Sequence, residues 1–299
     1  MVNLLYHLRG VISVLYLTIN TLFWGSFLFP VTFLRIIVPL KSWRKICGRV
    51  AIFIAESWIY FNNVGLILSR NIQFQIDGLE KLDRESWYLV ISNHQSWVDI
   101  PVLQKVFYKK IPFLKFFLKK ELIWVPILGP AWWALDFPFM KRYSGEFLKK
   151  HPHLKGKDIE ITKKACEKFR DNPVSIMNFT EGTRYTAEKH SRQRSPFKNL
   201  LKPKAGGIGF VLTAMGDQLS YVLDVTVSYP EGVPDFWQFL CGKVKVINVK
   251  IRKMPVTAEL LGDYVQDKSY RVQFQRWLNG LWEEKDHYLE YIDKQNMKN

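Results

Sequence analysis

The chain has 299 residues, which is enough for one large domain with an additional segment. Hydrophobic residues make up 48% of it and charged residues 23%, a balance that excludes both a disordered chain and a uniformly membrane-embedded one. The 43 lysines and arginines outnumber the 27 aspartates and glutamates, giving a net charge of +16. This excess predicts an anionic partner: nucleic acid, anionic lipid or a phosphorylated substrate.

Eleven tryptophans and 21 phenylalanines favour the lipid partner, because aromatic side chains collect at bilayer interfaces. The three cysteines, Cys47, Cys166 and Cys241, are odd in number and far apart. They argue against a disulfide framework and for a reducing compartment. The histidine cluster His151-Pro-His153 is read as a solvated loop, so no metal site is predicted.

The first predicted element is an apolar helix. Val11–Leu34 contains no charged residue, and its 24 residues extend about 36 Å at about 1.5 Å each, enough to cross a hydrocarbon core of about 30 Å with some tilt. Asn20, Gly25 and Pro30 weaken it as a straight span. A cleaved signal peptide is not expected, because the apolar run is too long and no clear cleavage site follows.

A basic cluster comes next, and by the positive-inside rule it faces the cytoplasm: Lys41, Arg44, Lys45 and Arg49. The apolar stretch after it, Val50–Ser69, carries Glu56, Asn62 and Asn63. A second span, an interfacial helix and a re-entrant helix all stay open for this stretch. Residues 1–70 are predicted to anchor the chain against anionic headgroups.

Residues 71–299 read as an α/β domain. Strands are predicted in five runs: Asn71–Asp77, Trp87–Ser92, Val174–Phe179, Tyr221–Tyr229 and Lys243–Ile251. Helices are predicted at Asp99–Phe107 with Asp99 as the N-cap, at Lys155–Pro173, and from Ser269 to about Lys294. Strands alternating with helices imply a mixed, largely parallel sheet covered by helices.

Two polar motifs each follow a predicted buried strand. His94 and Asp99 come after Trp87–Ser92, and a Glu-Gly-Thr-Arg sequence ending at Arg184 comes after Val174–Phe179. Glycine permits a sharp turn, and the arginine fork suits a phosphate or carboxylate. From the residues alone, two structural alternatives stay open: a strand end followed by a helix cap, and a surface turn with a Glu181–Arg184 pair.

A third segment, Phe117–Arg142, is apolar and aromatic with basic residues at both ends. It suits a ligand with an anionic head and an apolar tail, or a core segment with solvated ends. A GxSxG nucleophile elbow, a Walker A sequence and a GxGxxG sequence are all absent from the chain.

Together these segments resemble the glycerolipid acyltransferases related to 1-acylglycerol-3-phosphate (lysophosphatidic acid) acyltransferase. The resemblance runs from about Asn71 to Tyr229, and the sequence LDVTVSYPEG (Leu223–Gly232) departs from the proline-and-valine block of many members. That departure leaves the acceptor open. The matching blocks are NHQSWVD (Asn93–Asp99), KKELIWVPILG (Lys119–Gly129), FPFMKR (Phe137–Arg142) and TEGTR (Thr180–Arg184).

The resemblance implies transfer of a fatty acyl group from a thioester to the free hydroxyl of a lysophospholipid, with 1-acylglycerol-3-phosphate as the expected acceptor. His94 is the implied general base and Asp99 its partner. Residues five apart on a straight helix lie about 140° apart around its axis, so the chemistry needs the predicted break between them. Ile123–Trp133 is expected to line an acyl groove. The implied substrate-binding residues are Glu181, Gly182, Thr183, Arg184, Lys120 and Arg142. Arg184, with the backbone amides around Gly182 and Thr183, is expected to bind the acceptor phosphate.

The resemblance implies no metal and no bound cofactor; the acyl donor is a co-substrate, acyl-CoA or acyl-carrier protein. The expected partners are the lysophospholipid and an anionic membrane, without nucleic acid. The expected location is a membrane of the bacterial inner (cytoplasmic) type, with the catalytic domain facing the cytoplasm. Three alternatives stay open: an acyltransferase for another lysophospholipid, a membrane-bound lipid-binding protein, and a lipid hydrolase that uses water as the acceptor.

Overall fold

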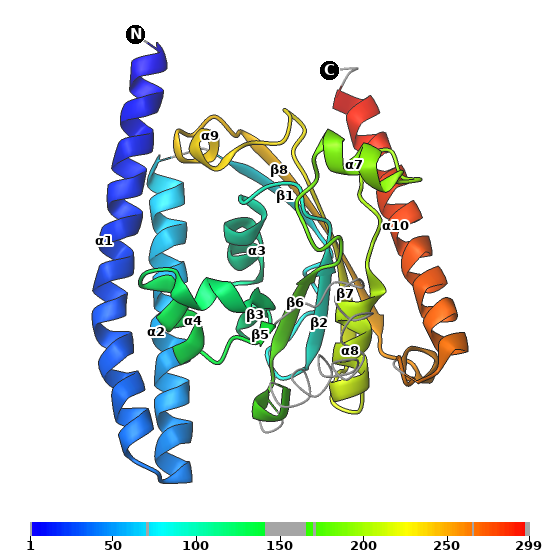
Figure 1. Cartoon of the computed structure of the whole chain (residues 1–299). Coiled ribbons are helices and arrows are strands. Elements are labelled where there is room, and N and C mark those ends of the chain that lie inside the picture. Colours follow the sequence, from blue (N-terminus) through cyan, green and yellow to red (C-terminus); the bar gives the residue numbers. More distant parts are fainter. Residues whose placement is uncertain (1, 70–71, 141–165, 170–171, 265, 297–299) are drawn as a thin grey trace.

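The structure is a computed structural model that describes residues 2–69, 72–140, 166–169, 172–264 and 266–296 (Figure 1). The α-helices are α1 (Val2–Ile37), α2 (Lys41–Ser69), α3 (Asp99–Phe107), α4 (Leu128–Ala134), α7 (Ala187–Gln193), α8 (Ala205–Met215), α9 (Phe236–Leu240) and α10 (Lys268–Asn296). The 3-10 helices are η1 (Lys120–Trp124), η3 (Glu167–Phe169) and η4 (Ala258–Leu260). The strands are β1 (Gln73–Asp77), β2 (Tyr88–Ser92), β3 (Leu114–Phe116), β4 (Leu118–Lys119), β5 (Phe139–Met140), β6 (Ser175–Phe179), β7 (Tyr221–Ser228) and β8 (Val246–Pro255).

Six strands form one sheet in the order β1-β8-β7-β2-β6-β3. The β7–β8 pair is antiparallel, and the other four pairs are parallel. Strands β4 and β5 form a separate two-stranded sheet. The predicted mixed, largely parallel α/β fold is therefore confirmed.

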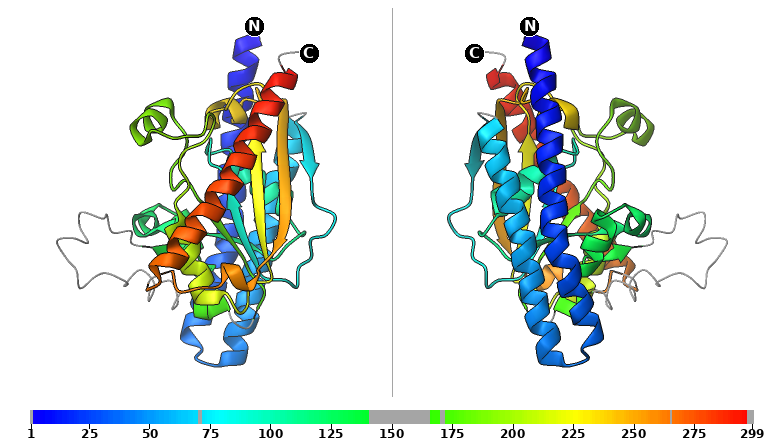
Figure 2. Two further views of the ribbon diagram at one scale, coloured as in Figure 1. Left: turned by 90° about the vertical axis from the view of Figure 1, so that its right-hand side faces the viewer. Right: turned by 90° about the vertical axis from the view of Figure 1, so that its left-hand side faces the viewer.

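Both faces of the sheet are covered by helices, and the central strand β2 is buried on both sides. Tyr88 and Val90 pack into a core that includes residues of α2 and α3, whereas Leu89 and Ile91 pack into a second core with α8 and α10. Figures 1 and 2 show α1, α2 and α3 on one side of the sheet and α8 and α10 on the other. A strand buried on both faces needs apolar residues at every position.

Helices α1 and α2 form an antiparallel pair joined by residues 38–40 (Figure 2). The Asn20 side chain of α1 donates to the Trp58 carbonyl oxygen at 3.1 Å and to Asn62 Oδ1 at 2.8 Å, so these polar groups satisfy one another between the two helices. Glu56 pairs with Arg84 of the α/β domain. Among the described helices, one segment, Leu4–Ile37, is long and apolar enough to cross a membrane.

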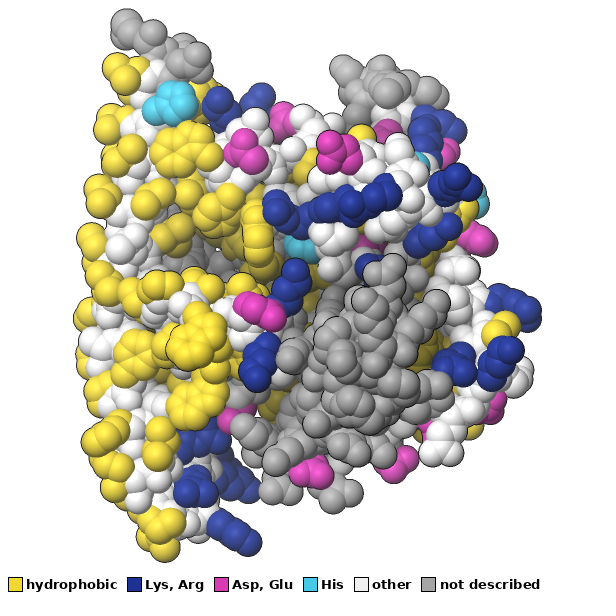
Figure 3. All heavy atoms as spheres, viewed as in Figure 1, with side chains coloured by type: hydrophobic (Ala, Val, Ile, Leu, Met, Phe, Trp, Pro, Cys, Tyr) yellow, Lys and Arg dark blue, Asp and Glu magenta, His cyan; other side chains and the backbone are white. Residues whose placement is uncertain are grey.

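The helix pair exposes many large apolar side chains along its length (Figure 3). Contiguous apolar surface on this scale marks an interaction site with a membrane or another protein. Exposed residues of α1 and α2 include Leu4, Leu8, Ile12, Leu15, Ile19, Phe23, Phe27, Phe33, Ile37, Ile46 and Phe53.

Several predicted boundaries differ from the observed ones. Strand β8 begins three residues later than predicted and runs to Pro255, because its pairing with β7 continues through Tyr221↔Pro255. Helix α8, in the glycine-containing run from Ala205, was not predicted. The predicted helix Lys155–Pro173 falls mostly outside the described residues.

The prediction of Asp99 as an N-cap is wrong by one position. Val98 is the N-cap of α3, its carbonyl oxygen accepts the Val102 N–H, and Asp99 is the first helical residue. The Asp99 carboxylate instead accepts N–H groups from the preceding turn, at Gln95 and Ser96.

Candidate active site

The two polar motifs meet at the carboxyl ends of β2 and β6, which are neighbouring parallel strands with Ser92 opposite Phe179. The Thr180 N–H donates to the Ser92 carbonyl oxygen at 3.3 Å, and the Tyr185 N–H donates to the His94 carbonyl oxygen at 2.7 Å. In open α/β sheets, ligands bind outside the carboxyl ends of parallel strands. The sheet therefore brings the motifs together at a position suited to a ligand.

The His94 Nδ1 lies 2.8 Å from Asp99 Oδ2. That oxygen also accepts the N–H groups of Gln95 at 2.7 Å and Ser96 at 3.0 Å, so it is an acceptor and Nδ1 carries the proton. The Asp99 side chain is 0% exposed, and that of His94 is 10% exposed. The remaining nitrogen, Nε2, is therefore an unprotonated acceptor when the ring is neutral, as a general base requires.

Aromatic stacking fixes the plane of the His94 ring. Its centroid lies 3.8 Å from that of Phe179, with 13° between the planes. The Phe179 ring in turn stacks on Phe116 at 6.0 Å. Because Nδ1 is held by Asp99 and one ring face by Phe179, the direction of Nε2 is set by two independent contacts.

Glu181 is fully buried below this turn. Its Oε1 accepts the His94 N–H and its Oε2 accepts the Leu201 N–H, both at 3.3 Å. Burial raises the pKa of the Glu181 carboxyl to about 8, against the opposing effect of these two hydrogen bonds. At neutral pH this group is mostly uncharged, and its hydrogen bonds are to backbone rather than to a basic side chain among the described residues.

Gly182 has a φ of +72°, in the left-handed region that glycine adopts without steric cost. Its N–H donates to the Phe179 carbonyl oxygen at 2.8 Å and closes the turn. Of the amides expected to face the phosphate, that of Gly182 is therefore used within the turn. The Thr183 hydroxyl accepts from Lys189 Nζ at 3.0 Å, and the same ammonium group donates to the Arg184 carbonyl oxygen at 2.9 Å.

The Arg184 guanidinium lies over the Trp97 ring, 4.6 Å from its centroid. No carboxylate pairs with it among the described residues, so the alternative of a Glu181–Arg184 surface pair is wrong. Trp97 belongs to the same turn as His94, so the cation–π contact holds the guanidinium against the turn that carries the histidine. An unpaired guanidinium at the edge of the site suits a phosphate.

The remaining predicted residues are less well connected to this cluster. Lys120 is exposed at the first residue of η1. Arg142, His151 and His153 lie outside the described residues. Among the described residues, no group of three or more His, Cys, Asp or Glu side chains is arranged to hold a metal ion.

The segment Ile123–Trp133 places large apolar side chains at the surface next to the helix pair. Trp124 is 85% exposed, and Ile127 and Trp133 are also exposed. Arg35 of α1 donates to the carbonyl oxygen of Ala134, the last residue of α4, at 3.2 Å and so connects α4 to the helix pair. The apolar surface of α1 and α2 therefore continues onto α4.

Two contributors to the site were not predicted. The Asn93 side chain donates to the Val227 carbonyl oxygen and accepts the Val227 N–H, both at 2.9 Å. The Tyr229 hydroxyl donates to Asp99 Oδ1 at 2.6 Å. The signal available in the sequence was that Tyr229 ends a predicted buried strand, just as His94 follows one; the order of the strands was needed to connect them.

Comparison with known proteins gives matches over the same region. The family model for acyltransferases matches residues 73–229, just over half of the chain. The 1-acyl-sn-glycerol-3-phosphate acyltransferase gamma of Homo sapiens is 27% identical over 194 residues, which are 61% of this chain and 46% of that protein. The lysocardiolipin acyltransferase 1 of Danio rerio is 25% identical over 301 residues, covering 94% of this chain and 71% of that protein. The chain thus spans about half the length of the human relative.

A solved structure has the same fold. It is that of the 1-acyl-sn-glycerophosphate (LPA) acyltransferase, PlsC, from Thermotoga maritima, with a TM-score of 0.56 at 17% identity, covering 95% of this chain and 98% of that one. The family model spans the strands that carry His94, Asp99 and the Glu-Gly-Thr-Arg turn. The chain belongs to the acyltransferase family.

Proposed function

We propose that this protein is a membrane-attached enzyme that transfers a fatty acyl group from a thioester to the free hydroxyl of a lysophospholipid. The observation that carries the proposal is the His94–Asp99 pair, in the same turn as Trp97, on which the Arg184 guanidinium stacks without a carboxylate partner among the described residues. The acceptor that we propose first is 1-acylglycerol-3-phosphate, which would give phosphatidic acid. Family membership and the names of the relatives support this choice.

In the proposed reaction, His94 Nε2 takes the proton of the acceptor hydroxyl as its oxygen attacks the thioester carbonyl carbon. A C–O bond forms, the C–S bond breaks, and the imidazolium returns the proton to the leaving thiolate. Asp99 holds the Nδ1 proton and stabilises the imidazolium charge during the step. The acyl donor is acyl-CoA or acyl-carrier protein, and no other cofactor is proposed.

We propose that Arg184 binds the acceptor phosphate, because its planar fork matches the phosphate oxygens and no carboxylate competes for it in the described chain. Thr183, next to it, contributes to the shape of this turn, and Glu181 holds the turn of His94 in place. Lys120 and Arg142 are secondary candidates for the same phosphate. The exposed apolar segment Ile123–Trp133 is proposed to receive the acyl chain.

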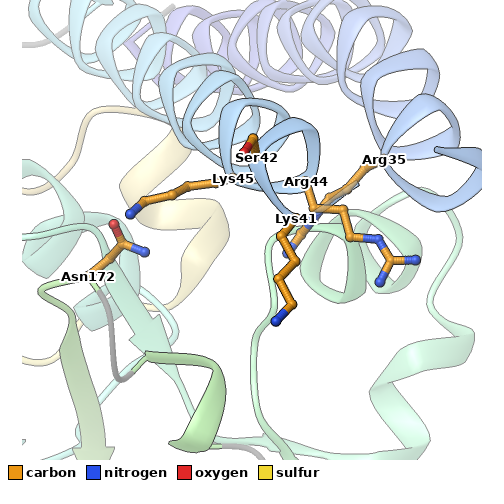
Figure 4. A pocket seen from close by; sticks show the side chains of 6 residues that line it. All are labelled: Arg35, Lys41, Ser42, Arg44, Lys45 and Asn172. Carbon is orange, nitrogen blue, oxygen red and sulfur yellow. The ribbon is translucent and has the colours of Figure 1, made fainter. Parts of the chain in front are cut away.

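Residues 1–70 are proposed to attach the enzyme to the membrane, and residues 71–299 to carry the reaction. The exposed apolar face of α1 and α2 would enter the bilayer. At the end of this helix pair, Arg35, Lys41, Arg44 and Lys45 line an open hollow of about 390 Å³ with Ser42 and Asn172 (Figure 4). Cations beside an apolar surface suit the anionic headgroup layer, with the α/β domain on the cytoplasmic side.

A second acceptor deserves a direct test because the relative that covers 94% of this chain is named a lysocardiolipin acyltransferase. That match extends beyond the family model into both terminal regions. Lysocardiolipin, like 1-acylglycerol-3-phosphate, presents phosphate and a free hydroxyl, so the same Arg184 and His94 groups would serve it.

The proposed function is tested by adding labelled oleoyl-CoA and a panel of lysophospholipids to membranes that contain the protein. Label in a single diacyl product identifies the acceptor. Release of free fatty acid without an acceptor would support a lipid hydrolase instead. Absence of both products, with acyl-CoA and with acyl-carrier protein as donor, would favour a lipid-binding protein.

A further inference from the structure

The two carboxylate oxygens of Asp99 have different partners. Oδ2 accepts the His94 Nδ1 proton and two backbone N–H groups, whereas Oδ1 accepts the Tyr229 hydroxyl at 2.6 Å. Among the hydrogen bonds of the described residues, the Tyr229 hydroxyl is the sole donor to Oδ1. Its hydrogen bond to a charged oxygen belongs to the short and strong class.

The sheet fixes where this hydroxyl lies. Tyr229 directly follows β7, which pairs with β2 in parallel as far as Ser92↔Val225. Beyond that point, the Asn93 side chain continues the pairing to the backbone of Val227. The strand end that carries Tyr229 is therefore tied to the residue before His94.

We infer that Tyr229 is a positioning residue for His94, acting through Asp99. It holds the Asp99 carboxylate in the orientation that meets Nδ1, and it draws part of the negative charge toward Oδ1. This inference rests on the proposed function, because Tyr229 would set the basicity of His94 as the general base. The acyltransferase resemblance implies no role for Tyr229.

The Tyr229 hydroxyl is suited to remain a donor. The residue is 6% exposed, and burial raises its pKa well above the usual value, with the Asp99 charge adding to the effect. Three elements bring titratable groups to Asp99: the β2–α3 turn brings His94, the end of β7 brings Tyr229, and the turn after β6 brings Glu181. Because burial raises the pKa of Glu181 to about 8, that carboxyl adds little negative charge near Asp99 at neutral pH.

The test compares Tyr229→Phe with Tyr88→Phe. Tyr88 is a matched control, because its buried hydroxyl also donates to an aspartate, Asp83 at 3.0 Å, but away from the site. In Tyr229→Phe the Asp99 charge is no longer shared, so the imidazolium of His94 is favoured. We expect the acidic limb of kcat/KM to move to higher pH and plateau kcat to fall about tenfold, with little change in either KM.

A second readout does not depend on turnover. Diethylpyrocarbonate modifies neutral imidazole, so the rate of His94 modification against pH, followed by peptide mass analysis, reports the same titration. Its midpoint is expected to rise in Tyr229→Phe and to stay unchanged in Tyr88→Phe. Incorporation of 3-fluorotyrosine at position 229, a stronger donor that retains the hydroxyl, is expected to lower the midpoint.

Unchanged midpoints in both Tyr229 variants would overturn the inference and would leave Tyr229 with a packing role in the core only. Equal shifts in Tyr88→Phe would overturn it as well, because the effect would then not pass through Asp99. A wild-type protein that transfers no acyl group contradicts the proposed function instead, and the modification profile still decides the role of Tyr229.

Discussion

Glu181 and His94 are 87 positions apart in the chain, yet the Glu181 carboxyl accepts the backbone N–H of His94 at 3.3 Å. The other oxygen of the same carboxyl accepts the Leu201 N–H. One buried side chain thus connects the turn after β2, the turn after β6 and the segment before α8. It helps to hold the backbone of His94 in place.

The first prediction concerns pH and stability. Folded Glu181 keeps its proton up to about pH 8, whereas the unfolded chain releases it near 4.5, so its stabilising contribution is complete below pH 4.5 and is lost as the pH rises toward 8. At about 1.4 kcal/mol per unit of pKa, the total is on the order of 5 kcal/mol. The Tm of the wild type should fall relative to that of Glu181→Gln across this range.

The glutamine variant cannot accept both backbone N–H groups, because its NH₂ group is a donor. It should therefore have a lower Tm than the wild type at low pH, and the difference in Tm should become smaller as the pH rises. The exposed Glu188→Gln serves as the control and should show no such trend. Parallel Tm curves for wild type and Glu181→Gln would show that the buried carboxyl does not gain a proton on folding.

The second prediction concerns Arg184. Replacing it with alanine should raise the KM for the phosphate-bearing acceptor about 10- to 100-fold, because a charge-assisted pair is lost, and should leave the KM for the acyl donor nearly unchanged. Steady-state kinetics with each substrate varied in turn measures both values. Arg192, exposed on the nearby helix α7, provides an arginine-to-alanine control.

If the Arg184→Ala effect fell mainly on the donor, the guanidinium would belong to the acyl-CoA or carrier-protein site. The proposed position of the acceptor phosphate would then be wrong, while the assignment of His94 would stand.

The third prediction concerns the basic end of the helix pair. Changing Lys41, Arg44 and Lys45 to glutamine should weaken binding to vesicles that contain phosphatidylglycerol by roughly 100-fold at low salt, from about 1 kcal/mol per cation. Binding to pure phosphatidylcholine vesicles, carried by the apolar face of α1 and α2, should change little. Vesicle co-sedimentation measures both.

A charge-matched control lies on α10, where Lys268, Arg271 and Arg276 line a separate open groove. Changing these three to glutamine removes the same net charge from the opposite side of the sheet. An equal loss of vesicle binding in both triple variants would mean that overall charge, rather than the end of the helix pair, directs the protein to anionic lipid.

The sequence predicted five of the six strands of the large sheet and the main motifs, because both depend on local patterns; the three-residue strand β3 was not predicted. A run of apolar residues bounded by polar ones marks a strand buried on both faces, and β2 and β6 follow that pattern closely. The sequence identified His94, Asp99 and Arg184, because they lie shortly after such strands and within motifs of the acyltransferase resemblance. The Phe179 stack on His94 and the Tyr229 bond to Asp99 depend on strand order, which no local pattern encodes.

Two departures from prediction have a similar physical origin. Asp99 was predicted as an N-cap because aspartate commonly accepts the first helical N–H groups; here its carboxylate turns back to Gln95, Ser96 and His94 instead. Gly182 was predicted to offer an amide to a ligand, but the tight turn that requires glycine also uses that amide. In both cases the group forms a hydrogen bond within its own turn, and this bond competes with the predicted role.

The most direct test of the central claim is acyl transfer by His94→Ala beside His287→Ala, an exposed histidine on α10 that serves as the control. Both variants should bind vesicles and unfold like the wild type. Transfer of labelled oleate to a lysophospholipid should fall by at least about 100-fold in His94→Ala and stay at the wild-type rate in His287→Ala. Full transfer by a well-folded His94→Ala would contradict the assignment of His94 as the general base.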